Sequence, residues 1–338
     1  MNFINYLIKK IVILMEDRIK YERFLFGEGN EISIDDIEFC VDRIIKLPKI
    51  RPFQLEKAVR LSLEYCKLAD FRIKLLEKSN ECPVLIFQLF KRGGFVFSEI
   101  EPFLNNRRTF LLCYYFRKEI VKFENFIGRK NKPNGFDESF FENQDNIDQL
   151  IEYGFLPSSI EYYLKYDMID DFLKADNEYQ KPKWSPFEWS LEPQNLDLLS
   201  FAGFFGSIKC FKHLMMKGFR INDQVISMVV CSGCLDLYHL CNGQQSVIPQ
   251  HVYNATEFFY IPLLSFMIEN GADINTGYEN NLTLLHLAAE NGHLSVVEYL
   301  VNQKADINAY TKDVERLYLW RLLFILQRDM VILVLLNI

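Results

Sequence analysis

Apolar residues recur along most of this chain every three or four positions, which is the period of an α-helix with one buried face. Near the N-terminus such stripes are formed by Ile34, Ile37, Val41 and Ile44, and then by Leu55, Val59, Leu63, Leu75 and Leu76. Prolines interrupt the pattern at Pro48, Pro52 and Pro83, where helices are expected to end or begin. The pattern predicts an all-α chain, in which residues 1–135 form a helical region of unassigned function.

From about residue 145 onward, helices that end at a glycine and are followed by a second helix form a recurring pattern. The string Leu150–Phe155 resembles Leu214–Phe219, and Gly154 and Gly218 occupy the same place in the two strings. Glycine is common at such positions because it adopts the left-handed backbone conformation without a Cβ clash. We therefore expect residues 136–195 to form degenerate helix pairs.

Two Ala-Asp-Ile-Asn strings, at 272–275 and 305–308, are 33 residues apart. Between them, Thr283 can cap a helix, His286 is close enough to bond back to its hydroxyl, and Gly292 can end the helix. The apolar stripe of a second, antiparallel helix follows, formed by Leu294, Val296, Val297 and Leu300. Repeats of this length with two helices each are stacking units that bury a core only together.

Residues 282–308 strongly resemble an ankyrin repeat, although Leu284 stands where the family has proline and Asn281 where it has a turn glycine. Residues 197–222 match this copy without gaps, and 225–241 match it with a shortened hairpin. The string Gly206–Phe211 and residues 106–120 are similar to a divergent ankyrin group expanded in parasitic protists. The resemblance implies an α-solenoid of helix pairs, with ankyrin repeats over 196–310, and it implies no reaction.

The ankyrin pattern stops abruptly after Asp313. Residues 311–338 do not continue it, whereas an adjacent reading frame would restore Gly-Lys-Thr-Leu-Phe-Val-Ala. We interpret this tail as a frameshift scar that leaves the last repeat without a polar cap, or else as a degenerate capping helix.

Composition limits the classes of partner. Hydrophobic residues make up 49% of the chain, the net charge is −7 and the isoelectric point is about 5.4, so a nucleic-acid surface is not expected. The most basic stretch, 129–135, is predicted to be a solvated linker. Eight scattered cysteines favour a reducing compartment, the cytoplasm or alternatively the nucleus. Charged residues interrupt the apolar stretch 317–338, so no membrane association is expected.

The sequence offers little catalytic chemistry. Cys231 and Cys234, with His239 and Cys241, have the spacing of half a zinc site, but helix packing accounts for each of them. His286 and His293 are expected to bond loop backbone, and Asp167, Asp170 and Asp171 to lie on solvated helix faces. Phosphate-loop, nucleophile-turn and metal-helix motifs are not found in the sequence. We therefore expect no enzyme activity and no cofactor.

The resemblance implies a binding surface formed by the hairpin tips and the exposed positions of each first helix. In the strongest copy these positions are Tyr278, Glu279, Asn280, Glu290 and Asn291, with Tyr310 at the next tip. The gapless alignments transfer the pair at 290–291 to Phe204 and Phe205, and to Glu257 and Phe258. We expect Phe204, Phe205 and Phe258 to be aromatic anchors for a partner; the alternative is that preceding helices cover them.

These observations favour a non-catalytic protein–protein interaction module. One alternative is an adaptor whose N-terminal helices recruit a second machine, such as a ubiquitin ligase. Two others are a zinc protein or enzyme that uses Cys231–Cys241, and a gene product without function, which the aberrant tail suggests.

Overall fold

The computed structural model describes residues 37, 40–42, 44–45, 55–106, 109–130, 132, 138–141, 143–175, 180–188, 196–241, 249–278, 281–290, 294–307 and 309. The described chain forms two compact units, Ile37–Arg220 and the residues from Ile221 onward, here called the N-terminal and C-terminal units. The boundary between them falls inside the region 196–310 that the sequence assigns to ankyrin repeats.

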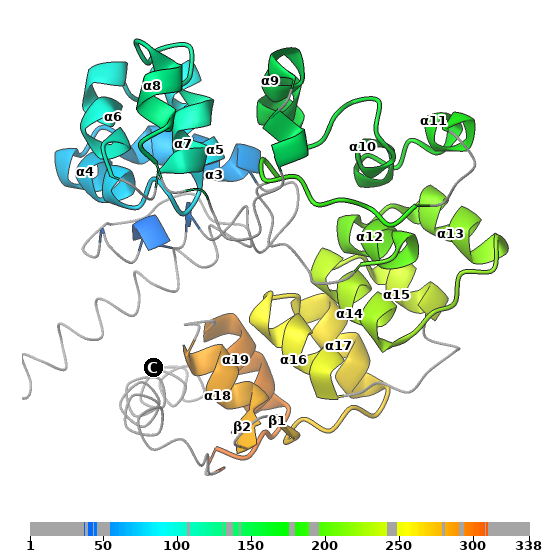
Figure 1. The fold of residues 1–338 in the computed structure, drawn as a ribbon. Coiled ribbons are helices and arrows are strands. Elements are labelled where there is room, and N and C mark those ends of the chain that lie inside the picture. The colour runs from blue at the N-terminus through cyan, green and yellow to red at the C-terminus, as the bar shows by residue number, and fades with distance from the viewer. Residues whose placement is uncertain are drawn as a thin grey trace, which may run out of the picture. The chain divides into compact units, whose positions relative to one another are not determined.

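The N-terminal unit consists of short helices in consecutive pairs (Figure 1). Its elements are α3 (Leu55–Tyr65), α4 (Ala69–Glu77), α5 (Pro83–Lys91), α6 (Phe97–Leu104), α7 (Phe110–Tyr115), α8 (Phe123–Ile127), the 3₁₀ turn η1 (Glu138–Phe141), α9 (Gln144–Tyr153), α10 (Ile160–Lys165), α11 (Ile169–Lys174), α12 (Leu198–Phe205) and α13 (Ile208–Met216).

The C-terminal unit continues the pattern and adds one small hairpin. Its elements are α14 (Asp223–Ser232), α15 (Leu235–Cys241), α16 (Pro249–Glu257), α17 (Ile261–Glu269), β1 (Gly277–Tyr278), β2 (Leu282–Thr283), α18 (Leu284–Glu290) and α19 (Leu294–Asn302). The two strands are antiparallel, with Tyr278 opposite Leu282.

The first helices of successive pairs pack against one another. In the N-terminal unit α3 packs on α5, α5 on α7 and α10 on α12; in the C-terminal unit α14 packs on α16 and α16 on α18. The second helices of successive pairs also pack against one another, α4 on α6 and α11 on α13. The predicted all-α solenoid of helix pairs is confirmed within each unit, and stacked pairs already occur from Leu55, well before residue 145.

Local sequence explains where the helices start and stop. Gly206 and Gly233, with φ of 72° and 70°, end α12 and α14 in the left-handed conformation that glycine adopts without a Cβ clash. Asn222 caps α14 by accepting a hydrogen bond from the Val225 amide at 2.9 Å, and Pro83 opens α5. The stripe predicted near the N-terminus is also buried, since Val41 and Ile44 are fully inaccessible to solvent.

Asp167 corrects one expectation from the sequence. It does not lie on a solvated face: its carboxylate accepts hydrogen bonds from the amides of Lys209 and Cys210, at 3.1 and 2.9 Å. A turn in the α10–α11 pair therefore caps the second helix of the α12–α13 pair. The link was not readable from the sequence because donor and acceptor are more than 40 residues apart.

Candidate interaction surface

The two Ala-Asp-Ile-Asn strings contact each other in the C-terminal unit. The Asn275 side-chain oxygen accepts a hydrogen bond from the Asp306 amide at 2.7 Å. Within the first string, the Asp273 carboxylate accepts from the Asn275 amide at 2.9 Å, which closes a local turn. The first string thus shapes its own turn and is bonded to the same string of the next repeat.

Thr283 and His286 form the bond that their spacing predicts. The Thr283 amide donates to His286 Nδ1 at 3.2 Å, and the Thr283 hydroxyl lies 2.6 Å from the same nitrogen. A nitrogen that accepts from a backbone amide carries no proton, so the ring is neutral, with its proton on Nε2. Burial lowers the pKa of His286 to about 4, which keeps the ring neutral near pH 7.

The hairpin places Tyr278 over the first helix of the preceding pair. The rings of Tyr278 and Tyr253, from α16, lie 4.7 Å apart, and both side chains are half-buried. Asn281, at a φ of 62°, forms the end of the tight turn beside Gly277. The sequence analysis did not single out Tyr253, although it is four residues from Glu257 and therefore on the same helical face.

Glu257 and Phe258 lie at the other end of this face. Glu257 is exposed in the last turn of α16, and Phe258 follows it half-buried. Tyr278, Tyr253, Glu257 and Phe258 thus extend from the hairpin to the turn that begins α17. We call these four residues the α16 face.

Two comparisons with known proteins found similar proteins. Residues 267–316 match the family model for ankyrin repeats, described as many copies. A crystal structure of the human ASB11 ankyrin repeat domain is 14% identical over 48% of this chain and 82% of that chain, with a TM-score of 0.37. No curated protein matches this chain. Residues 267–316 are therefore similar to ankyrin repeats, which are generally protein–protein interaction modules.

Phe204 and Phe205 are not the exposed ankyrin anchors that the alignment predicts. Their exposed fractions are 4% and 5%, because Trp184 lies on both rings, with centroids 5.7 and 5.9 Å away. The cover comes from residues 180–188, which precede α12 in the chain, and also from the preceding helix α10, whose Lys165 Nζ lies 5.9 Å from the centre of the Phe205 ring. The expectation that these two rings are exposed is wrong, whereas Phe258 is partly accessible.

The structure does not describe the side chains of the remaining predicted surface positions. Glu279, Asn280, Asn291 and Tyr310 lie outside the described residues, as do His293 and the tail 311–338. Glu290 closes α18, but its side chain is likewise not described. Their assignment to a binding surface stays a prediction.

Two cysteines of the α14–α15 pair, Cys231 and Cys241, lie in the packed interior, whereas Cys234 is partly accessible and His239 is exposed. Cys231 and Cys241 are buried, and burial raises the pKa of the Cys231 thiol and raises that of Cys241 to about 12. A protonated thiol is a poor nucleophile and must lose its proton to bind zinc. Within the described ranges, no group of three or more His, Cys, Asp or Glu side chains is arranged to hold a metal ion.

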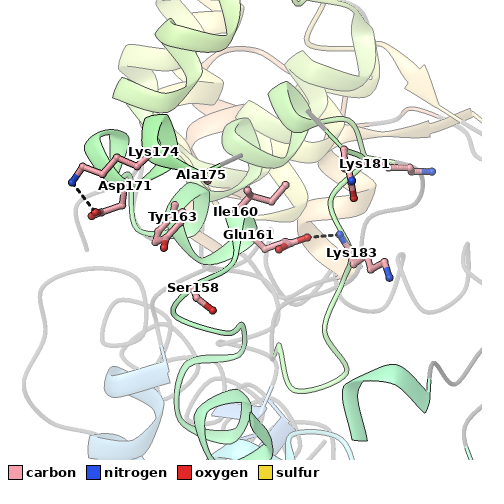
Figure 2. Close-up of a pocket in the computed structure, with 10 residues that line it drawn as sticks. Ser158, Ile160, Glu161, Tyr163, Asp171, Lys174, Ala175, Lys181 and Lys183 are labelled. Carbon is pink, nitrogen blue, oxygen red and sulfur yellow. Dashed lines mark hydrogen bonds and ion pairs between the residues drawn. The ribbon is translucent and has the colours of Figure 1, made fainter. Parts of the chain in front are cut away.

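A polar cavity of about 620 Å³ lies in the N-terminal unit between α10, α11 and residues 180–183 (Figure 2). Two of its carboxylates already have partners: Glu161 accepts from the Lys183 amide at 2.8 Å, and Asp171 is 3.4 Å from Lys174 Nζ. Its lining contains neither cysteine nor histidine.

The basic stretch 129–135 also differs from expectation at Lys130, whose ammonium donates to the Leu104 carbonyl and to the Asn106 carbonyl, the latter at 3.2 Å. This lysine holds the end of α6 and is not a purely solvated charge. In the described part of the chain, none of the helices has the length and apolar character needed to cross a bilayer.

Proposed function

We propose that this protein is a non-catalytic interaction module that binds a partner protein through the α16 face of its ankyrin repeats. The observation that carries the proposal is the row formed by Tyr278, Tyr253, Glu257 and Phe258, which is partly accessible on a first helix and its hairpin. Aromatic side chains that keep part of their area in solvent are frequent anchors of protein interfaces. The cytoplasmic location and the kinship with the divergent protist group belong to the same proposal.

The test is affinity capture from native lysate with the full chain. Three baits are compared: wild type, the variant Phe258→Glu/Tyr278→Glu, and a matched control, Leu240→Glu. Leu240 is 36% exposed on α15, a second helix of the same unit. Circular dichroism must first show that all three baits are folded.

A partner that binds wild type and the Leu240→Glu control, but not the folded double variant, would support the α16 face. A partner that binds all three equally would exclude this face. Loss of binding by both variants would show that added negative charge on the C-terminal unit prevents binding wherever it is placed, and that the α16 face is not specifically required.

An adaptor role has its own supporting observation in the N-terminal unit. Leu68, Val96 and Val121 are 43%, 57% and 84% exposed and lie where α4, α6 and α8 begin, at equivalent turns of three successive pairs. Apolar residues repeated at one position of stacked pairs form a second candidate surface. Changing all three to lysine should then remove a different partner from the one lost by Phe258→Glu/Tyr278→Glu.

A further inference from the structure

Residues 180–188 form an irregular segment, here called the strap, between α11 and α12, and it ends in a turn closed by a hydrogen bond from the Glu188 amide to the Ser185 carbonyl at 3.0 Å. Its central side chain, Trp184, enters an aromatic cluster formed by Phe155, Phe201, Phe204 and Phe205, all with ring centroids within 5.9 Å of the indole. The indole stacks on Phe205 with an interplanar angle of 18°, while the other contacts are edge-on. Such a cluster gains both area burial and favourable ring geometry.

Three residues further on, Phe187 enters a second aromatic cluster. Its ring lies 5.4 Å from Phe141 of η1 and 5.7 Å from Tyr115 of α7, and only 1% of the residue is exposed. The Tyr115 hydroxyl donates to the Phe187 carbonyl at 3.3 Å. The strap is therefore held by its backbone as well as by its side chains.

The third anchor is a buried ion pair. Glu188 Oε2 lies 2.7 Å from Lys165 Nζ, and the two side chains are 0% and 1% exposed. The same ammonium donates to the Tyr153 carbonyl at 3.1 Å. Breaking one side of such a pair leaves a buried charge uncompensated, so the pair fixes Glu188 strongly in place.

These three anchors contact α7, α10 and α12, which are the first helices of their pairs. They also contact η1 and the turn that follows α9. The outer positions of first helices are the side on which ankyrin arrays bind their partners. The strap thus occupies the binding side of the N-terminal unit.

We propose that the strap is an intramolecular ligand that fills the partner-binding side of the N-terminal unit. The groove that removal of the strap would leave recognises a peptide with an aromatic residue, a second aromatic residue three positions later and a carboxylate directly after that, with the last four residues in a turn. Partner binding through the first helices is thereby confined to the other unit, a consequence that rests on the proposed function. The strap itself does not depend on that function.

Peptide complementation tests the proposal. In the full chain, Trp184→Ala/Phe187→Ala/Glu188→Ala removes all three anchors, and a labelled synthetic peptide of residues 181–188 supplies them in trans. Fluorescence anisotropy should show at least tenfold tighter binding to this variant than to wild type, whose groove is filled. A peptide in which alanine replaces the three anchor residues is the control and should bind neither protein.

If the folded variant does not bind the peptide, or if wild type binds it equally well, the groove does not recognise this segment and the proposal fails. A second measurement covers a variant that does not fold. In the otherwise unchanged chain, Trp189→Phe/Trp320→Phe leaves Trp184 as the only tryptophan. Acrylamide should quench it at least fivefold less than the same residue in the free peptide, whereas equal quenching would overturn the proposal.

Neither readout involves a partner protein. A failed complementation experiment therefore does not contradict the proposal for the α16 face, and a failed capture experiment does not contradict the proposal for the strap.

Discussion

The last turns of α12 and α16 occupy equivalent positions in the repeat alignment, yet their surroundings differ. Phe204 and Phe205 at the end of α12 lie under Trp184 and are almost inaccessible, whereas Glu257 is exposed and Phe258 half-buried at the end of α16. The helices are alike; what differs is a segment that lies between α11 and α12 and folds back over α12. A repeat alignment transfers backbone register reliably, but exposure depends on what else the chain brings to that face.

The largest expected effect comes from the ion pair beneath the strap. Lys165→Met leaves Glu188 buried without its cation and should lower the free energy of unfolding by about 3–5 kcal/mol. The matched control is Lys91→Met, because Lys91 and Glu152 are also 2.7 Å apart but are 42% and 44% exposed. This change should cost less than about 1 kcal/mol. Urea unfolding measures both, and equal losses would contradict the role of burial.

The two ends of the first helices can be compared directly. Phe204→Ala removes a buried ring and should cost about 3–5 kcal/mol, because it leaves a cavity beside Trp184. Phe258→Ala removes a ring that already meets solvent and should cost about half as much. Hydrogen exchange of the α12 and α16 amides measures the stability of each unit separately. A larger loss of stability for Phe258→Ala than for Phe204→Ala would contradict this expectation.

Gly154 tests how closely the strap approaches the helices. Its φ is +82°, and a Cβ at this position would collide with the Glu188 carboxylate. Gly154→Ala should therefore cost about 3 kcal/mol through backbone strain and overpacking. Gly218 has a φ of +95° with open space around it, so Gly218→Ala should cost only about 1 kcal/mol through strain. Equal losses of stability for the two variants in thermal unfolding would show that the strap moves away from position 154 at little energetic cost.

The smallest effect is expected from acidification of the C-terminal unit. Because the folded-state pKa of His286 is about 4, against 6.5 for an ordinary histidine, the unfolded chain binds a proton first as the pH falls. Stability should decline by about 2.5 kcal/mol between pH 6.5 and 4 and level off below that. Hydrogen exchange of residues 281–288 measures the decline.

His286→Asn should flatten this dependence only in part, because burial also lowers the pKa of His251. An unchanged pH profile in the variant would exclude His286 as a source. The strap region of the N-terminal unit contains no histidine among residues 180–188, so its exchange should change less over the same pH range.

Local interactions made much of the C-terminal unit predictable. The 33-residue spacing of the two Ala-Asp-Ile-Asn strings, Thr283 followed by His286, and Gly233 at a helix end each rely on contacts within a few residues or on exact repetition. Their physical requirements, a capped amide or a positive φ, are expressed by the residue type itself. For such features the amino-acid sequence was enough to predict the local structure.

The cover over Phe204 and Phe205, the cap that Asp167 provides and the Lys165–Glu188 pair were not predictable in this way. Each joins residues about 20 to more than 40 positions apart through an irregular segment or a turn, with no period to relate them. The sequence by itself determined the helices, their ends and the repeat. Only the tertiary structure decided which of the equivalent faces is occupied, because burial is a property of the neighbours that packing brings to a residue.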